Sequence, residues 1–391
     1  MRKVQLLLPT VAAGLTRVLQ LVLLVVLVRL SGEETENVLV TGFALLSAFA
    51  IITDSGASNF LLSLPQASLT RSVHSKAIGF HAALAALGAV VAVVLTFSAA
   101  DFDTVTSVAV ILGALAISQV LDSLTRTIRA PLLVGARDAG YAIPDLLLLF
   151  LKMGPVAAAV ALTRIDVLIL LPVASLMVVV ATWLIVRRSL PTGATPGVRV
   201  FPQIFEFGFS GSLSALYSQA PLVIGTAILG VAVAPLALAY RVAQPLEVLP
   251  ATLSQQLIPR VRILGWPLHK YWMPFFSLGL ALAVTLALGR DYVAAVFGGS
   301  SFDVMIFLIV LASVAPKFGN YGLIAYTMGA DLIRVRLIAT ITVGVLAVIL
   351  TISASLLFGA QGLAAVTLIS EVFMSVVIVT LIKRRRERLT R

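Results

Sequence analysis

The stretch Ser189-Leu-Pro-Thr-Gly-Ala-Thr-Pro-Gly197 lies near the middle of the 391 residues and is the one mid-chain segment rich in Pro, Gly and polar residues. Apolar runs of about 20 residues, the length that one helical crossing of a bilayer needs, recur on both sides of it. We therefore interpret 191–200 as a linker between two membrane-embedded halves, 1–190 and 201–391.

Composition supports this division. Hydrophobic residues make up 60% of the chain, charged residues 12%, and the mean hydropathy is +1.08, whereas about a quarter of the residues in soluble domains are charged. These values exclude a soluble globular enzyme, and the lack of cysteine excludes disulfides and thiolate metal sites.

The expected spans lie at 7–30, 39–63, 78–98, 105–125, 142–162, 167–187, 205–228, 234–257, 273–293, 303–327, 337–358 and 362–382. The predicted fold is an all-α integral membrane protein with twelve transmembrane helices in two six-helix bundles, related as parallel pseudo-twofold repeats.

Positive charge is distributed unevenly between the loops on the two sides. Of the 28 Lys and Arg residues, 21 fall in the termini and alternate loops of one side, three in loops of the other side and four inside spans. Because cytoplasmic loops carry the excess of Lys and Arg, both termini are predicted to be cytoplasmic. The run Lys383-Arg-Arg-Arg386 is then a lipid-headgroup anchor, and no nucleic-acid partner is expected. Arg17 interrupts the first apolar run, which we interpret as a retained span and not a signal peptide.

Four basic residues lie in the middle half of their spans: Arg17, Lys152, Arg241 and Lys317. A charge at the bilayer centre costs about 2.5–3.5 kcal/mol on insertion scales, so these side chains are not expected to face lipid. We predict that they line one water-filled interior of positive potential where the two halves meet. The alternatives are ion pairs with carboxylates, or snorkelling to the interface from a shifted helix.

Three acidic residues also lie within the predicted spans: Asp54, Glu247 and Glu371. Each is a candidate for binding an H⁺ or Na⁺ that returns as substrate leaves, and the alternative is that it neutralises one of the bases. Glu247 follows Arg241 by six positions, too far for a pair within one helix, so it needs a partner on another span.

Two further features concern the ends and bends of spans. Three further acids, Asp122, Asp145 and Glu206, lie near the cytoplasmic ends of their predicted spans, where we expect solvated or capping roles. Pro245 and Pro250 closely follow Arg241. Because proline removes a backbone donor from a helix, they predict a kink in the eighth span near this charge.

Motifs in both halves resemble one family. Leu30-Ser-Gly-Glu-Glu34 and Ala48-Phe-Ala-Ile-Ile-Thr-Asp-Ser-Gly56 are similar to its first loop and to an Asp-x-Gly in its second span. Ala237-Leu-Ala-Tyr-Arg241, followed by Leu257-Ile-Pro259-Arg260, is similar to its Tyr-x-x-Ala-x-Arg…Pro eighth span. Tyr326-Thr-Met-Gly-Ala-Asp331 and the segment 358–371 resemble its last two spans and their short loop. On these residues the chain resembles the Wzx-like oligosaccharide and polysaccharide flippases of the multidrug/oligosaccharidyl-lipid/polysaccharide (MOP) exporter superfamily.

The resemblance implies a flippase, not an enzyme, that moves an undecaprenyl-pyrophosphate-linked oligosaccharide repeat unit from the inner to the outer leaflet of the bacterial cytoplasmic membrane by alternating access. Arg17, Lys152, Arg241 and Lys317 would then contact the pyrophosphate, since guanidinium and ammonium groups bind phosphate oxygens. The expected partners are the lipid-linked oligosaccharide, membrane lipids, and the polysaccharide polymerase and glycosyltransferases of the pathway. We expect a monomer, no cofactor beyond a coupling H⁺ or Na⁺, and no catalytic or metal-ligating residue. In the seventh span the chain has Tyr217-Ser-Gln-Ala-Pro221 where many relatives carry an Asp.

Two other function classes remain open at this point. A multidrug or cation antiporter of the same superfamily calls for an acidic, aromatic-rich interior, whereas the spans here hold four bases to three acids and aromatics make up 7% of the chain. A membrane-embedded polysaccharide polymerase or ligase usually carries a sizeable outer loop, and all the predicted outer loops are short.

Overall fold

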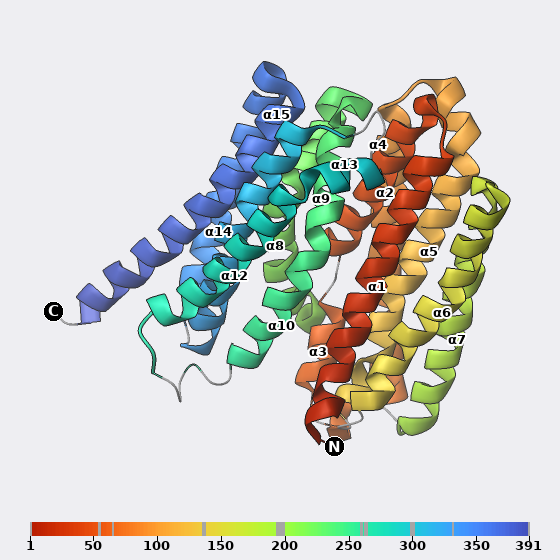
Figure 1. The fold of residues 1–391 in the computed structure, drawn as a ribbon. Helices are drawn as coiled ribbons and strands as arrows, with labels where there is room; N and C mark the ends of the chain where they lie inside the picture. The colour runs from red at the N-terminus through yellow and green to blue at the C-terminus, as the bar shows by residue number, and fades with distance from the viewer. Residues whose placement is uncertain are drawn as a thin grey trace. The chain divides into compact units, whose positions relative to one another are not determined.

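The computed structural model describes residues 2–53, 56–64, 66–134, 138–192, 200–258, 261, 265–297, 302–330 and 332–389. Within these ranges every regular element is helical (Figure 1). Packing divides the chain into two compact units, Met1–Ala215 and Leu216–Arg391.

The first unit is a bundle of long helices with short connections. Its elements are α1 (Arg2–Leu30), α2 (Glu33–Ile52), α3 (Ala57–Ser63), η1 (Gln66–Ser68), α4 (Arg71–Ser98), α5 (Phe102–Val134), α6 (Asp138–Leu162), η2 (Ile165–Leu170), α7 (Leu171–Ser189) and the start of α8 (Val200–Leu229). α5 packs against α2, α4 and α7, and α1 runs beside α6 (Figure 1). α2 and α5 approach closely at Gly42, where an added Cβ would lie 2.6 Å from Leu112 Cδ2.

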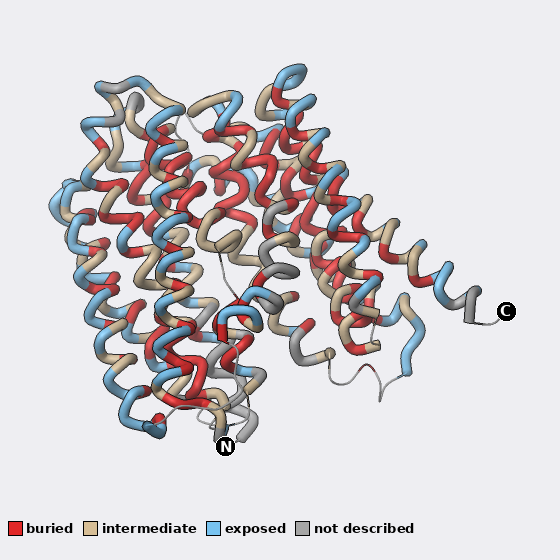
Figure 2. The backbone as a smooth tube through the Cα atoms, turned by 180° about the vertical axis from the view of Figure 1, so that it is seen from behind, coloured by how far each residue is buried: buried red, intermediate tan, exposed pale blue. Residues whose placement is uncertain are grey.

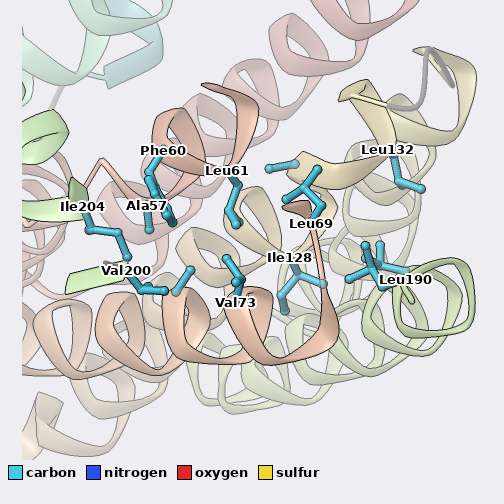
Figure 3. Packing of buried hydrophobic residues seen from close by; sticks show 13 residues of the cluster. Ala57, Phe60, Leu61, Leu69, Val73, Ile128, Leu132, Leu190, Val200 and Ile204 are labelled. Atoms are coloured by element: carbon cyan, nitrogen blue, oxygen red, sulfur yellow. The ribbon is translucent and has the colours of Figure 1, made fainter. Parts of the chain in front are cut away.

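A buried apolar cluster fills one end of this bundle (Figure 3). Phe60, Leu61, Leu69 and Val73 come from the segment around α3 and the start of α4, and Ile128 comes from α5. The cluster also contains Val200 and Ile204 of α8, whereas Tyr217 of the same helix belongs to the core of the second unit. The packing therefore divides within α8. The linker predicted at 191–200 stays a prediction, since 193–199 lie outside the described residues.

The second unit contains two helices interrupted by tight turns. After α8 come η3 (Gly230–Val233), α9 (Ala234–Ala243), η4 (Gln244–Glu247), α10 (Val248–Leu257), α12 (His269–Leu288), α13 (Arg290–Phe297), α14 (Val304–Gly329) and α15 (Ile333–Leu389). The 3₁₀ turn η4 separates α9 from α10 at Pro245, so the predicted kink beside Arg241 is confirmed. α15 breaks at Gly359, whose φ of 60° and ψ of −144° are not helical, into arms at 333–358 and 360–389. Glycine adopts this conformation at little cost because it lacks a Cβ.

The helices satisfy the length and polarity that a bilayer requires. Nine stretches of the described residues are long and apolar enough to cross a membrane, and two of them, of 38 and 52 residues, are long enough for two crossings each. Large apolar side chains are exposed, such as Phe150 of α6 at 71% and Val110 of α5 at 62%. Exposed and buried positions alternate along the helices (Figure 2). The prediction of an all-α, multi-pass membrane protein is confirmed.

Candidate functional site

Each unit contains a buried polar cluster within its bundle. In the first unit the cluster is formed by Lys152 of α6, Asp122 and Ser118 of α5, and Ser175 of α7. The Lys152 ammonium donates to an Asp122 carboxylate oxygen and, over 2.7 Å, to Ser118 Oγ. Ser175 Oγ donates to the other Asp122 oxygen over 2.8 Å. Ser118 and Asp122 are four residues apart on α5, so they share a helix face and both bind the Lys152 ammonium.

This cluster borders a small cavity of about 30 Å³. Apolar side chains form about half of its lining, and the polar part comes from Thr16, Gln20, Ser118, Gln119, Asp122 and Lys152. The volume is enough for about two water molecules, and polar partners are present to bind them. The structure therefore places Lys152 at a small pocket inside one bundle and pairs it with a carboxylate.

Arg17 lies beside the same cavity. Its guanidinium Nη1 donates to Gln20 Oε1 over 2.9 Å, and Gln20 itself lines the cavity. Arg17 and Lys152 are thus brought to one region of the first unit by α1 and α6, which pack side by side.

The second unit has a larger polar cluster arranged along α14. The Lys317 ammonium donates to Glu247 Oε1 on η4 over 2.7 Å, which supplies the interhelical partner predicted for Glu247. Three residues further along α14, Asn320 Nδ2 donates to Glu371 Oε2 on α15 over 2.8 Å. Ser375 Oγ in turn donates to Asn320 Oδ1 over 2.6 Å. One face of α14 therefore connects two carboxylates, Glu247 and Glu371.

The charge balance of this cluster is uneven. Lys317 is the one basic residue that forms an ion pair with either carboxylate among the described side chains. Glu371 is 2% exposed and its carboxylate is held by an amide. Burying a carboxylate is costly, and the amide of Asn320 offsets part of that cost for Glu371; its binding of a coupling ion stays a prediction.

Arg241 lies at the end of α9, where η4 begins. Its side chain is 4% exposed, and its Nη1 donates to Gln244 Oε1 over 3.0 Å. The neighbouring Tyr240 hydroxyl shares a 2.5 Å hydrogen bond with Thr367 Oγ1 on α15. The regular helix ends next to Arg241 because of the kink at Pro245. The Arg241 guanidinium therefore stays inside the bundle.

The four predicted bases fall two in each unit, and their placement in one shared interior stays a prediction. Asp54 lies outside the described residues. Among the described residues, no group of three or more His, Asp or Glu side chains is arranged to hold a metal.

Two predicted roles were wrong. Asp122 and Asp145 are not solvated or capping residues: Asp122 pairs with Lys152, and Asp145 pairs with Arg129 over 2.5 Å. Arg129, which the charge count assigned to a cytoplasmic loop, is 5% exposed and stacks 4.1 Å over the Tyr141 ring. The reason is that α5 continues to Val134, nine residues beyond the predicted end of its span at 125, and therefore carries Arg129 into the bundle.

Several polar residues of the clusters were missed from the sequence. Ser118, Ser175, Asn320 and Ser375 look like ordinary small or polar residues in an apolar run. Helical spacing could have indicated two of them, because Ser118 precedes Asp122 by four positions and Asn320 follows Lys317 by three, which places each pair on one helix face.

No family model matches this sequence, and no curated protein is similar to it in sequence. Solved structures do match in fold. The lipid II flippase MurJ in an inward closed conformation aligns with a TM-score of 0.70 at 14% identity, covering 96% of this chain and 87% of that one. A multidrug resistance MATE family transporter of the MOP superfamily, in an inward-facing conformation, aligns at 0.66 and 14% identity over 94% of each chain. A MOP superfamily transporter from Pyrococcus furiosus, described as having reverse polarity of its binding pocket, aligns at 0.61 and 15% identity over 99% and 95%.

The fold is therefore the twelve-helix fold of the MOP superfamily transporters. This confirms the fold that the motifs implied. Because the similarity lies in structure at about 14% identity, it defines the architecture and leaves the substrate to be argued from the side chains.

Proposed function

We propose that this chain is a flippase that moves an anionic lipid-linked oligosaccharide, with an undecaprenyl-pyrophosphate carrier, from the cytoplasmic to the outer leaflet of a bacterial inner membrane by alternating access. The fold supports a transporter, since its structural neighbours include a lipid flippase and multidrug transporters. Within that class, the choice of substrate rests on charge.

The observation that carries the choice is the burial of Arg241. A guanidinium that is 4% exposed inside a membrane bundle repels cationic drugs and attracts phosphate oxygens, to which it donates two parallel hydrogen bonds. The half-buried guanidinium of Arg17 in the other unit supplies a second such group. A guanidinium offers phosphate two parallel hydrogen bonds whereas an ammonium acts as a point charge, so we assign the phosphate contacts first to the two arginines.

The direction of movement follows from the membrane potential. With the inside negative, each net negative charge that moves outward gains about 2.3 kcal/mol per 100 mV. The predicted orientation, with both termini in the cytoplasm, places the more basic face on the side where the substrate is loaded. Glu371, held by Asn320, is the proposed site of a coupling H⁺ or Na⁺.

The test is leaflet exchange of a fluorescent lipid-linked oligosaccharide in proteoliposomes. Arg241→Ala is expected to lower the exchange rate about tenfold or more, because one charge-assisted pair is lost. Arg241→Lys keeps the charge but loses the bidentate geometry, so an intermediate rate is expected. Arg164→Ala is the matched control, since it removes an exposed guanidinium that pairs with Asp166 outside the bundle, and wild-type exchange is expected.

Three results would overturn the proposal. Unchanged exchange in Arg241→Ala removes this residue from the substrate path. Export of a cationic dye by wild type, without exchange of any lipid-linked sugar, favours the antiporter. Conversion of the lipid-linked sugar to a new product favours the polymerase or ligase.

A further inference from the structure

A second polar pocket lies in the first unit, away from the buried clusters, between the start of α4 and the end of α7. Its volume is about 300 Å³. It is lined mainly by Arg71, Ser72, His74, Ser75, Trp183 and Arg187. Figure 3 shows the packing beneath this region, where Leu69 and Val73 lie near Ile128 and Leu190. The pocket therefore combines basic and hydroxyl groups with the apolar side chains of Trp183 and Leu190.

Arg71 is held in place by the end of α7. Its Nε donates to the carbonyl oxygens of Arg187 and Leu190, each over 3.1 Å, and its backbone N–H donates to Pro191 O over 3.1 Å. These carbonyl oxygens lie at the C-terminal end of α7 and lack partners within the helix. Arg71 therefore caps α7, and its guanidinium stays at the pocket. Among the described residues, its Nη groups form no hydrogen bond.

Arg187 is oriented by a flat aromatic partner. Its guanidinium carbon lies 4.6 Å from the ring centroid of Trp183, one helical turn earlier on α7. Cation–π stacking of this kind fixes the plane of the guanidinium while leaving its edge open to an anion. Two positioned guanidinium groups thus border one pocket.

The surroundings contain positive charge without nearby acids in the same segments. Lys76 and Arg188 are exposed next to the lining residues. The sequence has no Asp or Glu at 55–100 or at 167–205, which covers both walls of the pocket. None of the described carboxylates forms an ion pair with Arg71 or Arg187. The pocket is therefore suited to an anion.

The lipid-facing surface of α7 leads directly to this pocket. Val173, Met177, Val180 and Leu184 are each more than 40% exposed and recur every three or four residues, so they form one apolar stripe. Arg187 is the next position of that stripe. An acyl chain lying along the stripe would place its phosphate at Arg187. In the predicted orientation, Trp183 would lie at the depth where aromatic side chains meet the headgroups.

We propose that this pocket binds the phosphate of an anionic phospholipid from the predicted cytoplasmic leaflet. Arg71 and Arg187 donate to the phosphate oxygens, and Ser72 and Ser75 donate hydroxyl hydrogen bonds to the headgroup. Basic pockets between helices on this side of a membrane are suited to anionic headgroups. The site is separate from the proposed substrate path and holds a resident lipid.

The experiment is native mass spectrometry of the purified full chain titrated with phosphatidylglycerol or phosphatidylcholine. We expect saturable binding of phosphatidylglycerol to wild type, and about tenfold weaker binding to Arg187→Ala. Arg188→Ala is the matched control, because it removes the same charge at the next residue, outside the pocket lining, and unchanged binding is expected. Arg71→Lys, which is less disruptive than removal of Arg71, should also weaken binding.

Several results would overturn the assignment. Equal losses in Arg187→Ala and Arg188→Ala would reveal a diffuse positive surface instead of a site. Equal binding of phosphatidylcholine would show that the anionic headgroup is not recognised. Displacement of the lipid by millimolar inorganic phosphate, or by a short-chain lipid pyrophosphate at equal concentration, would assign the pocket to free phosphate or to the transported substrate. Circular dichroism of each variant tests that weaker binding does not reflect misfolding.

Discussion

The Lys317 ammonium lies 2.7 Å from Glu247 Oε1, so an ion pair connects the middle of α14 to the 3₁₀ turn that follows Arg241. The Tyr321 hydroxyl, one turn later on α14, donates to the other Glu247 oxygen over 3.5 Å. This contact ties the kink of the eighth span to the helix that also holds Glu371 through Asn320. The turn that follows Arg241 is therefore held in place by two side chains of α14.

Breaking this pair from either side should destabilise the second unit. Lys317→Met or Glu247→Gln leaves one charge without its partner, and because the side chains are 20% and 25% exposed we expect a loss of about 2 kcal/mol each. The double variant should recover part of that loss, since no unpaired charge remains. Thermal unfolding of wild type, the two single variants and the double variant in detergent gives a double-mutant cycle. Additive losses of stability would contradict a direct pair.

The corresponding pair in the first unit is more buried. Asp122→Asn should lower the free energy of unfolding by about 3 kcal/mol, because the Lys152 ammonium then lacks a carboxylate at a site where Lys152 is 8% exposed. Asp103→Asn, an exposed carboxylate in the first turn of the same helix, is the control and should change stability by less than about 0.5 kcal/mol. Equal melting temperatures for the two variants would argue that the pair contributes nothing.

Close helix packing in the second unit depends on Gly322. A Cβ at this position would lie 2.2 Å from the carbonyl oxygen of Tyr271, a backbone atom of α12 that cannot move aside alone. We expect Gly322→Ala to destabilise the fold by about 1–3 kcal/mol through overpacking. Gly113→Ala, with no atom within 4 Å of the added Cβ, should be neutral or slightly stabilising because alanine favours helix. Thermal shifts of the two variants should therefore have opposite signs or clearly different sizes.

Glu371 should determine how exchange responds to an ion gradient. If it binds the coupling ion, wild-type exchange rises when an H⁺ or Na⁺ gradient is imposed, and Glu371→Gln abolishes that rise while keeping the hydrogen bond from Asn320. Asp166→Asn removes an exposed carboxylate and should respond to the gradient as wild type does. A variant at Glu371 that retains the full gradient response would assign coupling elsewhere.

The sequence predicted the apolar part of most spans because each is a long apolar run. The boundaries were predicted less well: α5 runs nine residues past its predicted end, and the span predicted at 39–63 is divided between α2 and α3. The kink at Pro245 was also predictable, since proline removes one backbone hydrogen bond wherever it lies in a helix. Glu247 was expected to need a partner on another span, and Lys317 provides it. These predictions rest on local chemistry, which a single sequence contains.

The ion pairs of the first unit could not be predicted in the same way. The sequence assigned Arg129 to a loop, and it placed Asp145 at the cytoplasmic end of its span in a solvated or capping role. In the structure each neutralises the other, over 2.5 Å, which allows α5 and α6 to continue as helix past the apolar segment. Pairing between helices depends on their packing and rotation, and one sequence does not specify these.

The turn at Gly359 has a consequence for how the chain is made. Because a single residue connects the two arms of α15, the penultimate and final crossings have almost no free chain between them. The translocation machinery would then receive them as one helical hairpin, and neither arm could insert and wait for the other. In the predicted orientation, the arginines after the final arm would hold that hairpin at the cytosolic surface, so replacing them with neutral residues should leave both arms unintegrated together.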